Sequence, residues 1–93
     1  MTHSQVIPVA PTKKGHRLWI QGLRDKGIVA PRFTVTITPE AITIVLGTEG
    51  KRAVTVAKGG IVDIESKKVT QWAQGATQAL VTFTPDTLTI TRA

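Results

Sequence analysis

The sequence predicts a mostly β protein with short helices, folded as a single domain over residues 1–93. Fifteen of the 93 residues are threonine, and most of them alternate with Val, Ile, Leu or Phe. This is the two-residue period of a strand with one buried face. A strand–turn–strand pattern also occurs twice in the chain. We therefore expect two repeats, over residues 5–48 and 51–92, each too small to bury much core without the other.

The repeated pattern is clearest over residues 33–44, FTVTITPEAITI, and residues 79–90, ALVTFTPDTLTI. At a constant offset of 46 residues, six of the twelve positions are identical. Each copy places Thr-Pro and an acidic residue between two alternating apolar runs. Proline at the second position of a turn pre-sets the φ angle that the turn needs. Both copies are therefore predicted to be β-hairpins.

Two more strands are expected before each hairpin. The apolar runs at residues 6–10 and 53–57 are predicted to be the first strand of each repeat. The segments KGHRLWI at 14–20 and KGGIVDI at 58–64 are predicted to include the second. The offset between these latter segments is 44, so the second repeat gains two residues before its hairpin.

The two extra residues are expected in a short helix. Ser66 is a suitable N-cap, Gly75 is suited to end the helix, and one helical face is apolar, with Val69, Trp72 and Ala73. The first repeat shortens this helix to about one turn around Leu23 that ends at Gly27.

Composition excludes several classes of function. The chain has no cysteine and only two histidines, His3 and His16, so neither a disulfide framework nor a Cys- or His-rich zinc site is expected. Nucleotide-binding and activated-nucleophile motifs are missing, so we expect no enzyme and no cofactor. The apolar stretches are far shorter than the ~20 residues that span a bilayer. The first residues lack a secretory signal, so we expect a cytoplasmic protein with no membrane partner.

The charge indicates a polyanionic partner, nucleic acid above all. The formal net charge is +6, from 12 Lys and Arg against 6 Asp and Glu. Eleven of the twelve basic residues lie in residues 11–32 and 51–68, and none lies in 33–50 or 69–91. In a fold with two-fold pseudo-symmetry, equivalent segments lie on the same face. We therefore expect one continuous basic patch, with the acidic hairpin turns pointing elsewhere.

The order of the elements resembles the swapped-hairpin superfamily, which includes AbrB-type regulators, MazE-type antitoxins and SymE-type proteins. The first repeat offers the family's residue types at Gly15, Arg17, Leu18, Ile20, Leu23, Arg24, Gly27 and Ile28. The second offers them at Gly59, Val62, Ile64, Lys67, Lys68 and Gly75. Gln21 and Glu65 stand where the family has proline, and Ile61 stands at the position of Arg17. The resemblance implies tandem AbrB-like swapped-hairpin units that form a pseudo-two-fold single-chain barrel, as a monomeric pseudo-dimer or a homodimer.

The resemblance also implies a function, that of a small DNA-binding transcriptional regulator of bacterial, plasmid or phage origin, encoded on a mobile element in some members. Its partner would be double-stranded DNA, bound by a basic face that releases counterions. Arg17 and Arg24 are the best candidates for base contacts or bidentate phosphate contacts. The full set of candidate nucleic-acid-binding residues is Lys13, Lys14, His16, Arg17, Arg24, Lys26, Lys51, Arg52, Lys58, Lys67 and Lys68.

Other hypotheses stay open at this point. A SymE-like RNA-binding or RNA-cleaving toxin would use His16 with Arg17, or Asp25 with Lys26, for proton transfer. A protein-interaction module would use a free sheet edge or an exposed tryptophan. The basic residues are also of the kind that keep strand edges from aggregating.

The two tryptophans are expected in different surroundings. Trp19 alternates with Leu18 and Ile20, so it faces away from them and is half exposed, where it is able to stack on a base. Trp72 shares the apolar helix face with Val69, so we expect it in the core.

Overall fold

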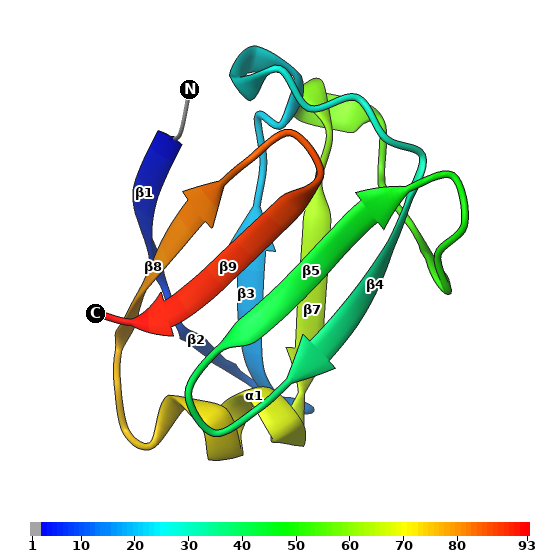
Figure 1. Ribbon diagram of the computed structural model, residues 1–93. Coiled ribbons are helices and arrows are strands. Elements are labelled where there is room, and N and C mark those ends of the chain that lie inside the picture. The colour runs from blue at the N-terminus through cyan, green and yellow to red at the C-terminus, as the bar shows by residue number, and fades with distance from the viewer. Residues whose placement is uncertain (1–2) are drawn as a thin grey trace.

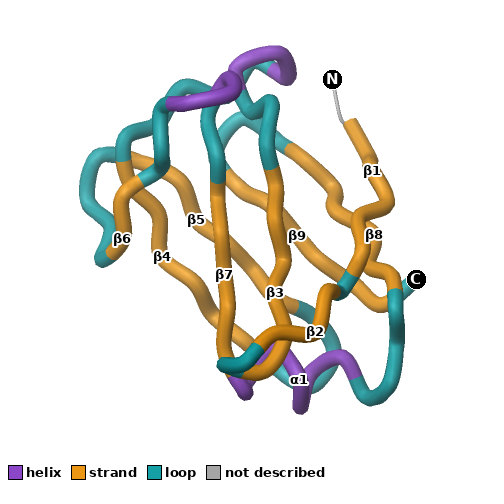
Figure 2. The backbone as a smooth tube through the Cα atoms, turned by 180° about the vertical axis from the view of Figure 1, so that it is seen from behind, coloured by secondary structure: helices purple, strands orange, loops and turns teal. Residues whose placement is uncertain are grey.

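The structure, a computed structural model, describes residues 3–93 and confirms a mostly β fold (Figure 1). Its strands form two antiparallel sheets that pack face to face (Figure 2). The larger sheet has the order β1-β8-β9-β5-β4-β6, from β1 (His3–Pro8), β4 (Arg32–Ile37), β5 (Ile42–Gly47), β6 (Arg52–Ala53), β8 (Gln78–Phe83) and β9 (Thr87–Arg92). The smaller sheet has the order β2-β3-β7, from β2 (Ala10–Thr12), β3 (Gly15–Ile20) and β7 (Val62–Ser66). The helical elements are α1 (Lys67–Ala73) and the 3-10 turns η1 (Arg24–Lys26) and η2 (Ala57–Gly59).

The core lies between the two sheets. Every second residue of the central strands points inward, as the period of two predicts. The inward residues that are almost fully buried include Leu18 and Ile20 of β3, Val62 and Ile64 of β7, Ile42 and Ile44 of β5, and Leu88 and Ile90 of β9. Val69, Trp72 and Ala73 of α1 join this cluster, which confirms the predicted apolar face of the helix.

The predicted hairpins form as expected. Residues 33–44 and 79–90 lie in the hairpins β4–β5 and β8–β9. Their turns close in the same way, because Thr38 donates its N–H to the Ala41 carbonyl and Thr84 to the Thr87 carbonyl, both at 2.9 Å. The threonine hydroxyls donate to the same two carbonyls.

The short helical segments also lie where the sequence predicts them. Ser66 caps α1, since its hydroxyl accepts the Val69 N–H. η1 ends at Gly27, which is left-handed with φ 77°. The predicted stop of α1 at Gly75 is one residue late, because Gln74 already adopts the left-handed conformation with φ 51°.

The expected closed barrel is not found among residues 3–93, whose strands lie in two separate sheets. The apolar run 6–10, predicted as one strand, is divided at Val9. β1 before it pairs with β8 in the larger sheet, and β2 after it pairs with β3 in the smaller one. The run 53–57 is divided in a similar way, with Arg52–Ala53 on β4 and a single bridge from Thr55 to Ile61. The chain thus passes from one sheet to the other within each run.

The strand registers relate the two halves of the chain symmetrically. In the β5–β9 pair, Thr43 lies opposite Thr89, its equivalent at the offset of 46 residues. In the β3–β7 pair, Trp19 lies opposite Asp63, its equivalent at the offset of 44. Because equivalent residues face each other in antiparallel strands, an approximate two-fold rotation relates these pairings.

Backbone hydrogen bonds outside the strands follow the same approximate two-fold symmetry between the two halves of the chain. The Val9 N–H donates to the Thr77 carbonyl at 2.9 Å, and the Val54 N–H donates to the Pro31 carbonyl at 2.9 Å. Val9 and Val54 are 45 residues apart, and Pro31 and Thr77 are 46 apart. The two crossings between the sheets are therefore held by equivalent bonds.

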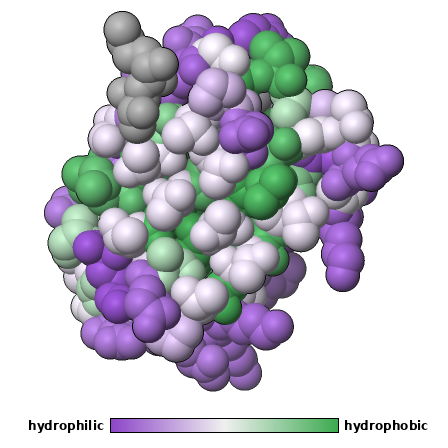
Figure 3. Space-filling model, viewed as in Figure 1, coloured by the Kyte–Doolittle hydropathy of each residue, from purple (hydrophilic) through white to green (hydrophobic). Residues whose placement is uncertain are grey.

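The outer face of the larger sheet is rich in threonine. One row crosses five strands in register, because Ser4 pairs with Thr82, Thr82 with Thr89, Thr89 with Thr43, and Thr43 with Thr36. Such cross-strand hydroxyl pairs stabilise a sheet modestly. Figure 3 shows this face as a broad pale area of intermediate hydropathy with strongly hydrophilic groups around its rim. Among the described residues, no helix has the length and apolar composition that a membrane crossing requires.

Candidate nucleic-acid interface

Four lysines gather at the end of the molecule where α1 lies. Lys13 and Lys14 form the turn between β2 and β3, and Lys67 and Lys68 begin α1. The turn lies against the start of the helix: a Cβ atom on Gly15 would lie 2.5 Å from the Ser66 carbonyl oxygen. All four lysines are exposed. We call Lys13, Lys14, Lys67 and Lys68 the α1-end cluster.

A second group of cations lies at the opposite end of the β3–β7 strand pair. The η1 turn carries Arg24 and Lys26, and the turn η2 carries Lys58. The two turns touch, because the Gly22 N–H donates to the Lys58 carbonyl at 3.3 Å and the Leu23 N–H to the Gly60 carbonyl at 3.4 Å. We call Arg24, Lys26 and Lys58 the η1-end cluster.

Lys26 is the least free member of the η1-end cluster. Its Nζ lies 4.7 Å from the centroid of the Phe83 ring, over the ring face. The same ammonium group donates to the Gly22 carbonyl at 3.5 Å. Arg24 and Lys58 are exposed, so they are the two cations of this end that face solvent most freely.

Arg17 does not belong to either cluster, because an acidic residue holds it on the middle of the sheet. Its Nε and one terminal nitrogen each donate to a carboxylate oxygen of Asp63 at 2.8 Å. This hydrogen bonding raises the pKa of Arg17 above its ordinary value, with the charges of Asp63 and Glu65 adding to the effect. The guanidinium also lies 4.3 Å from the centroid of the Trp19 ring. The contact between Arg17 and Asp63 is the only ion pair within residues 3–93.

Trp19 and Arg17 form one exposed group at the centre of the smaller sheet. Trp19 is 36% exposed while Leu18 and Ile20 are buried, which confirms the predicted outward orientation. Its indole N–H donates to the Gln21 side-chain oxygen at 2.9 Å. Arg17 thus contacts the face of the indole ring, and Gln21 binds its edge.

His16 also has an internal partner. Its Nδ1 lies 2.7 Å from the hydroxyl oxygen of Thr70 on α1, and its side chain is half buried. This contact joins β3 to the helix across 54 residues of sequence. The imidazole therefore helps to place α1 beside the lysines of the β2–β3 turn.

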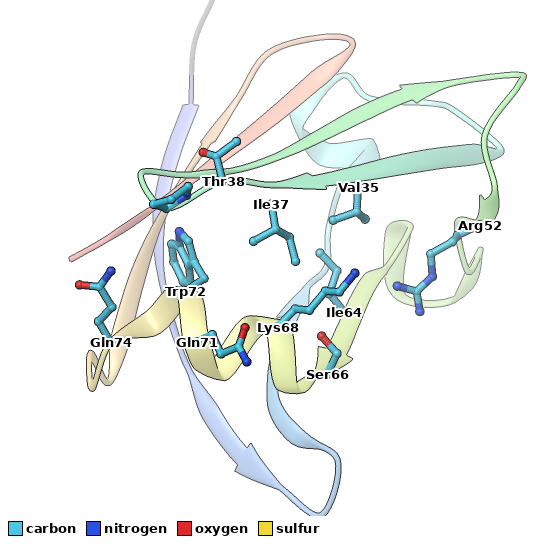
Figure 4. Close-up of a pocket in the computed structure, with 11 residues that line it drawn as sticks. Val35, Ile37, Thr38, Arg52, Ile64, Ser66, Lys68, Gln71, Trp72 and Gln74 are labelled. Atoms are coloured by element: carbon cyan, nitrogen blue, oxygen red, sulfur yellow. The ribbon is translucent and has the colours of Figure 1, made fainter.

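The remaining two candidates lie near the edge of the larger sheet. Lys51 and Arg52 are exposed on and before β6. Arg52 extends over a groove between the larger sheet and α1, and Lys68 of the α1-end cluster lines the same groove (Figure 4).

The expected continuous patch is therefore divided into two clusters. β3 separates them, and its six residues span about 20 Å at ~3.3 Å per residue. Asp63 and Glu65 lie between the clusters on the outer face of β7. One of the two acidic turns, the turn with Glu40, does not point elsewhere either. The turn with Glu40 lies beside α1, since the carbonyls of Pro39 and Trp72 both accept from Arg92.

Comparison with known proteins found no match to a protein-family model, to a curated protein or to a solved structure. The part of the chain that the structure describes also holds no group of three or more His, Cys, Asp or Glu that is able to bind a metal ion.

Sequence reasoning missed the partner of Arg17. Asp63 and Arg17 are 46 residues apart, and only the register of β3 on β7 makes them diagonal neighbours. The alternation around Trp19 was the available signal, because it places Arg17 and Trp19 on the outer face, where a residue of the next strand is able to reach them. The groove beside α1 had no signal in the sequence.

Proposed function

We propose that the protein is a small DNA-binding protein, a cytoplasmic transcriptional regulator of bacterial, plasmid or phage origin that binds duplex DNA. The observation that carries this proposal is the pair of cation clusters at the two ends of the β3–β7 pair. Six of their residues have no ion-pair partner within residues 3–93 and face solvent: Lys13, Lys14, Lys67, Lys68, Arg24 and Lys58. Free cations of this kind neutralise phosphates and release counterions.

The symmetry of the strand pairing supports a duplex as the partner. An approximate two-fold rotation relates the β3–β7 pairing, and the clusters lie at its two ends. A protein with two-fold symmetry suits a DNA site with inverted symmetry. About 20 Å between the clusters corresponds to about six base pairs at ~3.4 Å each. Each cluster would bind the backbone on one side of the centre of the site.

The same registers support a finer interpretation of the fold. We propose that residues 5–48 and 51–92 are two swapped-hairpin units of the AbrB type within one chain. The pairing of hairpin β4–β5 with hairpin β8–β9 through Thr43 and Thr89 fits this proposal. The equivalent bonds of Val9 and Val54 fit it as well.

Within this proposal, Arg17 serves the fold more than the DNA. Its bidentate contact with Asp63 joins β3 to β7 at the centre of the symmetric pair. Contacts to phosphate are assigned instead to the α1-end cluster and to Arg24 and Lys58.

Selection from random pools tests the proposal against its alternatives. Purified protein is mixed with equal amounts of random duplex DNA, single-stranded DNA and RNA at about 50 mM salt, where phosphate contacts are strong. We expect duplex DNA to be retained, and its enriched sequences to have approximate inverted symmetry. Preferential retention of RNA, or cleavage of RNA that a chelator does not suppress, would support the SymE-like toxin instead. Retention of no nucleic acid would leave the protein-interaction module.

A further inference from the structure

The groove beside α1 has the size and the lining of a site for a small molecule. Its volume is about 650 Å³, within the ~300–1,000 Å³ of typical ligand pockets. Strand β4, the β4–β5 turn, β7 and α1 border it, and Arg52 lies at one side (Figure 4). Its lining residues are Val35, Ile37, Thr38, Pro39, Arg52, Ile64, Ser66, Lys68, Gln71, Trp72 and Gln74.

The charge of the groove is wholly positive. Arg52 and Lys68 come from different elements and extend toward one another in Figure 4. None of the described residues that line the groove is acidic, and neither cation has an ion-pair partner among residues 3–93. Two unpaired cations that converge on one space favour an anion, and a guanidinium fits a carboxylate or phosphate with two hydrogen bonds.

The rest of the lining combines apolar side chains with polar groups at its margin, in comparable amounts. In Figure 4, Val35 and Ile37 lie on the β4 side of the groove and Ile64 lies beside Lys68. They offer an apolar surface next to the two cations. Hydroxyl and amide groups of the margin come from Thr38, Ser66, Gln71 and Gln74. Apolar groups that contact the body of a ligand, together with a few polar groups that fix its orientation, are usual in ligand sites.

One buried donor at this groove lacks an acceptor. Trp72 is 3% exposed, and its Nε1 is the only buried side-chain nitrogen or oxygen atom of residues 3–93 that has no hydrogen-bond partner. Leaving such a group unpaired is costly, so most buried polar groups in proteins have partners. In Figure 4 the indole nitrogen lies on the side toward Thr38.

We propose that this groove binds a small organic anion with a flat apolar body, whose carboxylate or phosphate lies between Arg52 and Lys68. The apolar body covers Val35, Ile37 and Ile64. The site shares Lys68 with the α1-end cluster, while Arg52 and the apolar residues lie outside both clusters. The proposal does not depend on DNA binding.

The test uses 8-anilinonaphthalene-1-sulfonate, an apolar anion whose fluorescence rises in an apolar site, and the uncharged N-phenyl-1-naphthylamine. Trp19→Phe makes Trp72 the only tryptophan of the chain, so energy transfer from Trp72 reports that the dye is bound to the protein. We expect saturable binding of the anionic dye at one site per chain, with energy transfer. The uncharged dye should bind at least about tenfold more weakly.

Substitutions in the Trp19→Phe background locate the site. Arg52→Gln with Lys68→Gln should weaken binding of the anionic dye at least about tenfold and change binding of the uncharged dye less than about twofold. Lys13→Gln with Lys14→Gln removes the same charge outside the groove and should leave both dyes within about twofold. Val56→Thr tests the smaller apolar cavity of about 220 Å³ near η1 and should have no effect.

Three results would overturn the proposal. The first is no saturable binding of the anionic dye up to millimolar concentration. The second is an equal loss of affinity in the groove variant and in the Lys13 and Lys14 variant. The third is a loss of binding in Val56→Thr. Thermal unfolding of each variant shows that it is folded, and duplex binding measured in parallel shows whether the two proposals fail separately.

Discussion

The two ends of the molecule share a backbone plan but offer different surfaces. At the α1 end, a seven-residue helix packs beside the β2–β3 turn. Four exposed lysines gather there, and one of them, Lys68, lines an open cationic groove. At the η1 end, a single 3-10 turn takes the place of the helix, and Lys26 lies on the Phe83 ring. Exposed Val29 and Val56 line a small cavity there.

The difference follows from the residues of two connections of equal length, 21–31 and 67–77. The second forms a helix, with Ser66 as its cap and Trp72 buried on its apolar face. The helix presents Lys67 and Lys68 beside the lysines of the neighbouring turn. A symmetric strand framework is thus able to carry two unequal ends, and we expect the α1 end to bind polyanions more strongly.

The largest expected effect is at the glycines where each end closes. Gly15 has φ 130°, and a Cβ there would lie 2.5 Å from the Ser66 carbonyl oxygen. Its equivalent, Gly59, has φ 80°, and its Cβ would lie 3.4 Å from the Gly22 Cα. We expect Gly15→Ala to lower the free energy of unfolding by about 3 kcal/mol or more, and Gly59→Ala by about 1–2 kcal/mol. Urea denaturation measures both.

Gly27→Ala is the control for this pair, because Gly27 also has positive φ but nothing lies within 4 Å of the added atom. It should cost about 1–2 kcal/mol through the backbone conformation alone. Equal losses at Gly15 and Gly27 would contradict the close contact between the β2–β3 turn and α1.

Removing the cations of each end should weaken duplex binding unequally. Replacing Lys13, Lys14, Lys67 and Lys68 with glutamine should reduce the slope of log K against log salt by about 4, and replacing Arg24 and Lys58 by about 2. At 0.1 M salt we expect a loss of affinity of at least about 100-fold for the first variant. Fluorescence anisotropy with a labelled duplex measures both slopes.

The Lys→Arg versions of the same positions keep the charge and should retain the slope within about 1. If the slope of log K against log salt fell equally in the two glutamine variants, the unequal number of cations at the two ends would have no effect on duplex binding.

A substitution at the centre of the β3–β7 face should strengthen duplex binding instead of weakening it. Asp63→Ala removes a carboxylate and releases the Arg17 guanidinium from its bidentate contact. We expect duplex binding to tighten about fivefold at low salt, since one more free cation then lies between the clusters. Competition against unlabelled duplex measures this change.

Glu65→Ala is the matched control, because it removes the same charge without freeing Arg17, which makes no hydrogen bond or ion pair with the Glu65 carboxylate. It should tighten binding only about twofold. A weaker complex in Asp63→Ala, with the protein still folded, would place Arg17 among the residues that must be held in position to contact DNA.

The smallest effect is expected at Lys26. Lys26→Met keeps most of the side-chain volume but loses the contact of the ammonium with the Phe83 ring, so stability should fall by about 0.5–1 kcal/mol. Lys58→Met, on an exposed turn, should change stability less. Chemical denaturation compares the two variants, and an equal effect would mean that the ring contact contributes nothing.

Local features of this fold were predictable from the sequence, and the long-range ones were not. The hairpins around Pro39 and Pro85 and the Ser66 cap depend on residues close in sequence. The division of residues 6–10 between two sheets was missed, because an alternating apolar pattern predicts a strand but does not indicate which sheet the strand joins. One basic patch was predicted where the structure has two clusters, because the positions of the cations depend on how β3 and β7 pair.

The candidate site follows the same rule. That Trp19 faces outward was predictable from its neighbours Leu18 and Ile20. That Arg17 is held by Asp63 required the register of two strands 46 residues apart. The sequence therefore identifies the segments that carry cations. Only the pairing of the strands shows which of these cations have no acidic partner.

The most direct test of the central claim is a salt titration of the unmodified protein on one duplex of about 20 base pairs, between 50 and 200 mM salt. Six free cations, at ~0.9 counterions each, predict a slope of log K against log salt near −5. A slope of that size would support a duplex bound by both clusters together. A slope shallower than about −2, or no binding at 50 mM salt, would contradict the account.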